Sequence, residues 1–299
     1  MSLLNLASDG LPNVLVVLYR TVAQTRAPMT REELLERVAP TNLAHEGGQM
    51  AAQTLNRWTE LGLFCTEGQN VTLASAPKSD FSDDADLVAV VRKAARQRAL
   101  AAENNVDLWA QEGARAADLT RSLAWLLAQD VYQTEFKNLE QLELEQMSDP
   151  GRRLMQNGTR LTGLQYWAHF LGFVRQPGGG DIDPTVAVRD VLSQCLEPGE
   201  GMLANAFVAR LAELLPVLDG GRFRRAVEAE IRSEALPVLA PEQLSSSLSR
   251  TLLYLMHGQD IVLERRADTG FSIVLTGHGG LRADHRYHWV RRPDAKGLQ

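Results

Sequence analysis

The sequence has few cysteines and no long apolar run. Its 299 residues include only Cys65 and Cys195, which are too few and too widely separated for a disulfide framework, so a reducing compartment is the expected setting. No stretch reaches the about 18 apolar residues that cross a membrane, and the first residues lack the basic and apolar segments of a secretory signal. We therefore expect a soluble, cytoplasmic protein with no membrane association.

Basic charge is not in excess either. Lys and Arg number 31 against 37 Asp and Glu, which gives a formal net charge of -6 at pH 7. This balance excludes a uniformly basic nucleic-acid coat, although local basic faces remain compatible with it. Hydrophobic residues at 44% and charged residues at 23% are typical of globular chains. The length is sufficient for two or three domains.

The first part of the chain predicts three helices followed by a hairpin. Apolar residues recur every three or four positions in each helix. Thr30 and Glu33 have the spacing of a capping box at a helix start, and Gly62 suits the left-handed position that ends a helix. The expected elements are helices over 11–22, 30–38 and 49–61, and strands over 63–66 and 71–73.

This order of elements resembles the winged helix-turn-helix family over roughly residues 8–75. The resemblance is clearest at 58–64 (WTELGLF), where the third helix leads through glycine into the first strand. A related phrase at 164–174 (LQYWAHFLGFV) predicts a second, imperfect copy, because Trp167 stands five residues before its glycine and Trp58 stands four before its own.

A third copy is expected at the C-terminus. Apolar spacing predicts helices over 203–218, 223–231 and 241–255, the last opened by Pro241. Alternating segments at 261–266 and 271–275, joined by a turn at 267–270, predict a hairpin.

The predicted fold class is mainly α with short β-hairpins. Tandem winged-helix domains are joined by a helical middle region in this prediction. The expected domains are an N-terminal winged-helix domain over 1–78, a helical middle domain with a second winged-helix-like unit over 79–198, and a C-terminal winged-helix domain over 199–299.

Polar side chains on the third helices and wings are the candidates for DNA contact. Gln and Asn can pair with adenine and Arg with guanine in the major groove, and guanidinium or hydroxyl groups suit phosphates. The same residues are also typical of solvated helix faces. The candidates are Gln49, Gln53, Asn56 and Arg57 in the first unit, Arg160 and Gln165 in the second, and Ser246, Arg250, Arg265, Arg266, Arg286 and Arg291 in the third.

The segment 282–292 is both basic and aromatic. It carries four arginines against one aspartate, together with Tyr287 and Trp289. Such a segment can lie along a nucleic-acid backbone or stack on bases. It can equally form a final strand with Tyr287 and Trp289 packed inward and the arginines in solvent. The sequence leaves both interpretations open.

Signals for catalysis are weak. The chain has no HExxH, paired CxxC, GxxxxGK[ST] or strand-linked GxGxxG motif. The three histidines at 278, 285 and 288 lack the compact spacing of a zinc site, and both cysteines stand among apolar neighbours, where a thiol is normally inert. We therefore expect no enzyme activity, no metal and no cofactor.

Two phrases resemble the DpdG family of bacterial 7-deazaguanine DNA-modification and restriction clusters. The first is 4–15 (LNLASDGLPNVL); the second is Leu-Gly-Phe-Val at 171–174, which leads through a glycine-rich loop to the helix that begins at 183–185. The resemblance implies a non-catalytic accessory of a phage-defence system that discriminates modified from unmodified DNA. It implies duplex DNA and other proteins of the same system as partners, and it carries no functional residue over to this chain.

Two other functions stay open. An assembly scaffold that docks partner subunits through its winged-helix units fits the acidic net charge and the many apolar helices. A transcription regulator would normally show the dimer symmetry that operators mirror. The sequence leaves open the DNA sequence or base modification recognised, the unit that binds and the oligomeric state.

Overall fold

The structure is a computed structural model and is mainly helical with small antiparallel sheets. Its contacts fall into two compact units. Unit 1 comprises Met1–Thr120 with Asn157–Leu171, and unit 2 comprises Arg121–Gln156 with Gly172–Gln299. The described residues are 3–4, 11–25, 27–42, 48–75, 77, 81–109, 115–155, 158–176, 180–236, 238–267, 270–278 and 280–294, with backbone alone for 280–284.

The fold class agrees with the sequence at this level, and the division of the chain differs. The predicted boundaries at 78 and 198 do not coincide with the two units, because the chain leaves unit 1 within one helix, returns for 157–171 and leaves again. Within the described residues, no helix has both the length and the apolar character that crossing a membrane requires.

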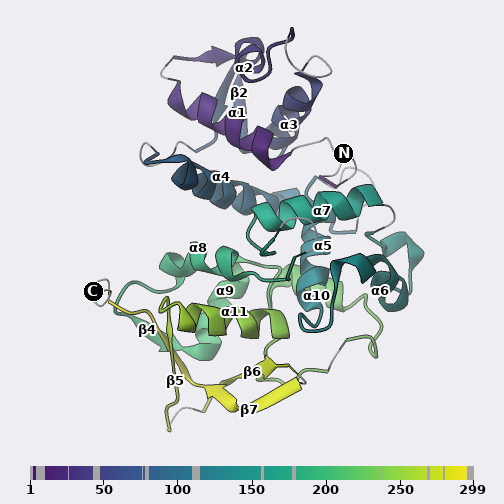
Figure 1. Ribbon diagram of the computed structural model, residues 1–299, viewed down its shortest axis with the longest axis vertical. Coiled ribbons are helices and arrows are strands. Elements are labelled where there is room, and N and C mark those ends of the chain that lie inside the picture. Colours follow the sequence, from purple (N-terminus) through teal and green to yellow (C-terminus); the bar gives the residue numbers. More distant parts are fainter. Residues whose placement is uncertain are drawn as a thin grey trace. The chain divides into compact units, whose positions relative to one another are not determined.

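Unit 1 begins with three helices and a hairpin (Figure 1). The predicted capping box is present, since Glu33 N donates to Thr30 Oγ1 over 3.2 Å and Thr30 N donates to Glu33 Oε2 over 2.9 Å. Gly62 has the predicted positive φ of 78°. The elements are α1 (Pro12–Gln24), β1 (Met29–Thr30), α2 (Arg31–Val38), α3 (Gln49–Glu60), β2 (Phe64–Glu67), β3 (Asn70–Leu73), α4 (Asp84–Ala99), a 3-10 turn (Ala102–Asn104), the start of α5 (Ala117–Ala128) and α7 (Gly158–Phe170).

The predicted hairpin is confirmed, and a third strand joins it. β2 and β3 pair antiparallel, and β1 pairs with the other edge of β3, so the strand order is β1-β3-β2. Helices α1, α2 and α3 supply the apolar side of this sheet. The two-residue β1 lies between two helices and has too few residues to show an alternating pattern.

The core of unit 1 joins α3 to α7. Trp58 is fully buried and Trp167 is 2% exposed, and their ring centroids lie 5.1 Å apart. Arg96, which is 3% exposed on α4, donates to the carbonyl oxygen of Leu171 over 2.9 Å. The two related tryptophan phrases of the sequence therefore contribute their tryptophans to one shared core. The two phrases do not form two separate cores.

Unit 2 contains the rest of the chain. Trp125 on α5 is fully buried, and its Nε1 donates to Gln146 Oε1 over 2.8 Å. The elements are the end of α5, a 3-10 turn (Phe136–Asn138), α6 (Leu139–Gln146), a 3-10 turn (Pro150–Arg152), α8 (Thr185–Cys195), β4 (Gly201–Leu203), α9 (Ala204–Leu214), α10 (Arg222–Glu228), α11 (Ser246–His257), β5 (Val262–Glu264), β6 (Ile273–Gly277), β7 (Gly280–Tyr287) and β8 (Trp289–Arg291).

The topology of unit 1 recurs in unit 2. The elements α8, β4, α9, α11, β5 and β8 follow the order of α1, β1, α2, α3, β2 and β3, and in both sheets the last strand is central. The strand order in unit 2 is β4-β8-β5. Helix α8 packs against α9 and α11 just as α1 packs against α2 and α3. The C-terminal copy therefore begins at α8, before the predicted boundary at 199.

The predicted C-terminal hairpin is wrong. Strand β5 pairs with β8, whereas β6 pairs with β7, so 261–266 and 271–275 are not partners. The β6-β7 hairpin is an insertion between β5 and β8, and it lies beside α11 (Figure 1). The preceding helix also starts later than predicted, because Ser245 caps it and Pro241 lies outside it.

The second predicted copy is divided between the units. Helix α7 belongs to unit 1, and the chain from Gly172 onward belongs to unit 2. Val174 and Ile182 form one antiparallel bridge, while residues 177–179 of the proposed wing lie outside the described residues. The helix expected after Asp183 is confirmed as α8, with Asp183 Oδ1 accepting from Thr185 N over 3.0 Å.

Candidate nucleic-acid interface

Helix α3 presents a polar face to solvent in unit 1. Gln49 and Asn56 are exposed, and Gln53 is partly exposed. Arg31, the first residue of α2, donates from Nη2 to Asn56 Oδ1 over 3.1 Å. The predicted positions of Gln49, Gln53 and Asn56 on a solvent face are therefore confirmed, and their contact with DNA stays a prediction.

Arg57 does not belong to that face. Its side chain is 5% exposed and its Nη1 pairs with Glu60 Oε2 over 3.1 Å. Arg57 stands three residues after Thr54 and four before Leu61, both buried, and this spacing puts all three on one side of the helix. The candidate Arg57 therefore lies on the buried side of α3, apart from the exposed polar residues with which the sequence grouped it.

Helix α7 carries the two candidates of the second predicted copy. Arg160 and Gln165 are both partly exposed and Tyr166 is 51% exposed, while Leu164 and Trp167 of the same helix are buried. The helix thus offers a polar surface, and its contribution to DNA contact stays a prediction.

Helix α11 is covered on several sides, contrary to the prediction. Ser246 is 6% exposed, and its Oγ accepts from Val131 N over 3.0 Å. Arg250 is partly buried and donates from Nη2 to the carbonyl oxygen of Ile182. Ser246 is therefore hydrogen-bonded inside unit 2. Arg250 is bonded to Ile182, a residue of the antiparallel bridge with Val174, instead of lying free on a helix face.

Basic and aromatic side chains gather at β5, β7 and β8. We call this set the C-terminal arginine surface; it comprises Arg265, Arg266, Arg286, Tyr287, His288, Trp289 and Arg291. Glu264 of β5 is the registered partner of Trp289 in β8, which brings residues distant in sequence side by side on two neighbouring strands. Arg265, Arg266 and Arg286 are exposed, and the other members are partly exposed.

Aromatic rings support two of these arginines. The guanidinium carbon of Arg266 lies 3.9 Å from the centroid of the Trp289 ring, and that of Arg265 lies 5.9 Å from the Tyr287 ring. Such cation-π contacts are attractive, and they hold a guanidinium group in place over the aromatic ring. The Arg266 backbone N–H also donates to His288 Nδ1 over 3.2 Å.

Two glutamates set the charge of the surface. Glu264 pairs with Arg266 over 2.8 Å and with Arg291 over 3.2 Å, and the hydrogen bond from Arg266 lowers the pKa of Glu264 below its ordinary value. Glu242 pairs with Arg286, whose hydrogen bond lowers the pKa of Glu242. Arg265 forms no ion pair with any described residue, so the surface keeps a positive excess.

The strand interpretation of the tail needs a correction. β8 is a strand, but its buried residue is Val290, while Trp289 and Arg291 are partly exposed on the other face. Tyr287 and Trp289 are therefore not packed inward. Sequence reasoning also missed Glu264 as the residue that orients two arginines, because its partner strand begins 25 residues later in the chain.

A family model of DpdG-like proteins matches residues 1–269. The chain belongs to the DpdG-like family. This membership suggests a role in a DNA modification cluster. The match ends before β6, so Arg286 and Arg291 lie beyond it. No curated protein and no solved structure matches the chain, and the family supplies no site residue.

Proposed function

We propose that this DpdG-like protein is a non-catalytic, DNA-binding accessory subunit of a bacterial DNA modification and restriction system. The C-terminal arginine surface carries the proposal, because four arginines oriented by glutamates and aromatic rings suit a run of phosphates. Phosphate contacts supply most of the salt-sensitive affinity of a DNA-binding protein. Family membership supplies the DNA modification context, and phage defence follows from it as part of the proposal.

We assign both repeated arrangements to the winged-helix class. The shared element order and the central last strand support this assignment for α1 to β3 and for α8 to β8. In a helix-turn-helix domain the recognition helix enters the major groove. Helix α3 offers Gln49, Gln53 and Asn56 for that role. Helix α11 is covered, so in unit 2 the proposed DNA contact is made by the wing strands β5 and β8.

A salt titration of duplex binding tests the proposal. Fluorescence anisotropy with a labelled duplex should give a measurable affinity at low salt and a linear loss of log affinity with log salt. Arg266→Ala should weaken binding and reduce the salt slope by about 1. Glu264→Gln should strengthen binding, because it releases Arg266 and Arg291 from their carboxylate.

Arg225→Ala is the matched control. Arg225 is exposed on α10 and donates to the carbonyl oxygen of Gly220, and Figure 1 draws α10 apart from β5. Its removal should leave affinity and slope unchanged. Absence of duplex binding by the wild type at low salt contradicts the proposal, as does an Arg266→Ala protein that keeps both the affinity and the slope of the wild type.

A second candidate function is the docking of partner subunits. An open groove of about 610 Å³ runs beside α9, where Val208, Ala209 and Ala212 give it a small-residue wall. The acidic net charge also suits a protein partner. A stable stoichiometric complex with another protein of the modification cluster, together with no DNA affinity of the free chain, would favour this function.

A further inference from the structure

An aromatic side chain lies exposed at the start of the β6-β7 hairpin. Phe271 is 65% exposed and stands two residues before the first residue of β6. Phenylalanine is among the residues most often buried in folded proteins, so an exposed ring on an ordered segment calls for a physical explanation. The family match ends at residue 269, and this ring lies beyond the part of the chain that the family covers.

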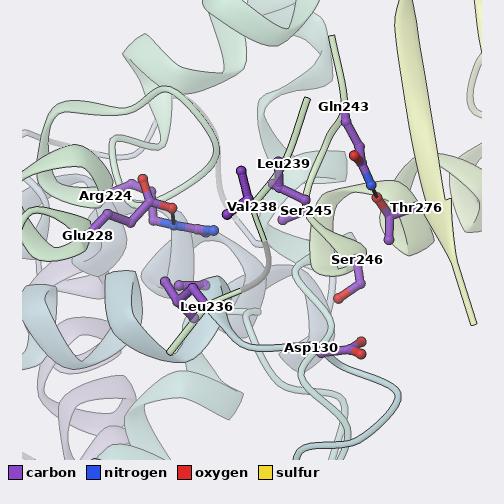
Figure 2. Close-up of a pocket in the computed structure, with 11 residues that line it drawn as sticks. Asp130, Arg224, Glu228, Leu236, Val238, Leu239, Gln243, Ser245, Ser246 and Thr276 are labelled. Atoms are coloured by element: carbon purple, nitrogen blue, oxygen red, sulfur yellow. Dashed lines mark hydrogen bonds and ion pairs between the residues drawn. The ribbon is translucent and has the colours of Figure 1, made fainter. Parts of the chain in front are cut away.

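The segment that carries Phe271 is held in place by hydrogen bonds to the chain before α11. Val274 N donates to the carbonyl oxygen of Glu242 over 2.8 Å. Gln243 Nε2 donates to Thr276 Oγ1 over 2.8 Å, a contact that Figure 2 draws. The ring therefore projects from an anchored strand, and a ligand that binds it has less chain entropy to overcome.

Ser272 connects this ring to the C-terminal arginine surface. The Ser272 hydroxyl, adjacent to Phe271 in the chain, accepts a hydrogen bond from Arg286 Nη1. The next residue, Ile273, is the registered partner of Tyr287 in the hairpin. Phe271 is thus one or two residues from positions that contact Arg286 and Tyr287, and both of these belong to the arginine surface.

The charge beside the ring favours a polyanion over a protein as its partner. Arg265, Arg266 and Arg286 are exposed in the same surface. A protein that covered the ring with apolar groups would also have to remove water from these guanidinium groups, which is costly unless each finds an acceptor. DNA offers phosphates to the arginines and base faces to the ring.

An intact duplex does not offer a free base face, because each base is stacked between its neighbours. An apolar side chain reaches a base face only where a base is unpaired or a base step is opened. We infer that Phe271 stacks on an unpaired base, and that the arginine surface prefers DNA with a local opening, such as a bulge, to an intact duplex. This inference rests on the proposed function, since the arginines must hold the neighbouring phosphates.

A comparison of two duplexes tests the inference. Fluorescence anisotropy with the full chain, at one salt concentration, would use an intact duplex and the same duplex with a central bulge of unpaired adenines. The wild type should bind the bulged duplex at least about fivefold more tightly, as expected for one stacked base. Phe271→Ala should bring the ratio of the two affinities close to one, whereas Phe271→Tyr, which keeps a ring, should retain the preference.

Leu144→Ala is the matched control, because Leu144 is an apolar residue that is 44% exposed on α6, outside the arginine surface. Its removal should leave the ratio unchanged. A folded Phe271→Ala protein that keeps the preference overturns the inference. So do equal affinities of the wild type for the two duplexes, and salt-sensitive binding in that case still supports the proposed function.

Two further outcomes separate this inference from the other proposals. If the wild type binds neither duplex at low salt, the proposed function fails and the inference fails with it. If Phe271→Ala keeps both DNA affinities of the wild type and loses a complex with another protein of the modification cluster, the ring belongs to a protein interface and the inference is overturned.

Discussion

At the scale of single residues, burial separates the two thiols. Cys65 is exposed on β2, whereas burial raises the pKa of Cys195 to about 11. Because the thiolate is the reactive form, only about one Cys195 side chain in a thousand is ionised at pH 8. Ellman's reagent should therefore react rapidly with one thiol per native chain at pH 8. The Cys65→Ser protein should lose that rapid reaction and regain one thiol on denaturation; rapid reaction of two thiols in the native wild type would contradict this.

At the scale of elements, the capping box decides where α2 begins. Thr30→Ala should lower the free energy of unfolding by about 0.5 to 2 kcal/mol, because a backbone N–H at the first turn loses its acceptor. The hydrogen bond from Thr30 N lowers the pKa of Glu33, so the contribution of Glu33 is present above its unfolded pKa and is lost as the pH falls through the lowered value. Urea denaturation at neutral pH measures the change.

Thr21→Ala is the matched control for this cap. The Thr21 hydroxyl donates to the carbonyl oxygen of Val17 within α1, where threonine gains little over alanine. Its substitution should leave stability nearly unchanged. Equal losses in the two proteins would show that the capping geometry is not the cause.

At the scale of the whole molecule, α8 belongs with the C-terminal elements. Leu192 on α8 is 3% exposed, and its replacement by alanine should cost about 2 to 5 kcal/mol. Hydrogen exchange followed by mass spectrometry should show lost protection in α11 and β8, with α1 to α3 unaffected. A domain boundary at 198 predicts the opposite, namely that the elements after 199 keep their protection.

Much of the fold was open to prediction because its signals are local. The helix spacing, the Thr30 box, the glycine after α3 and the β2-β3 hairpin each depend on residues a few positions apart. The β1 strand was not predictable in this way, nor was the pairing of β5 with β8, since these strands take their partners from distant parts of the chain. The candidate site divides likewise: Gln49 and Asn56 follow from helix periodicity, while the burial of Arg57 and Ser246 depends on neighbouring elements.

The sequence by itself determined that this chain is a mainly helical protein with small β elements, and its short phrases indicated the DpdG family. Tertiary structure decided which strands meet, where the C-terminal copy begins and which arginines remain at the surface. The physical reason is range: backbone geometry and apolar periodicity act over one or two turns, whereas burial and ion pairing depend on side chains that only folding brings together.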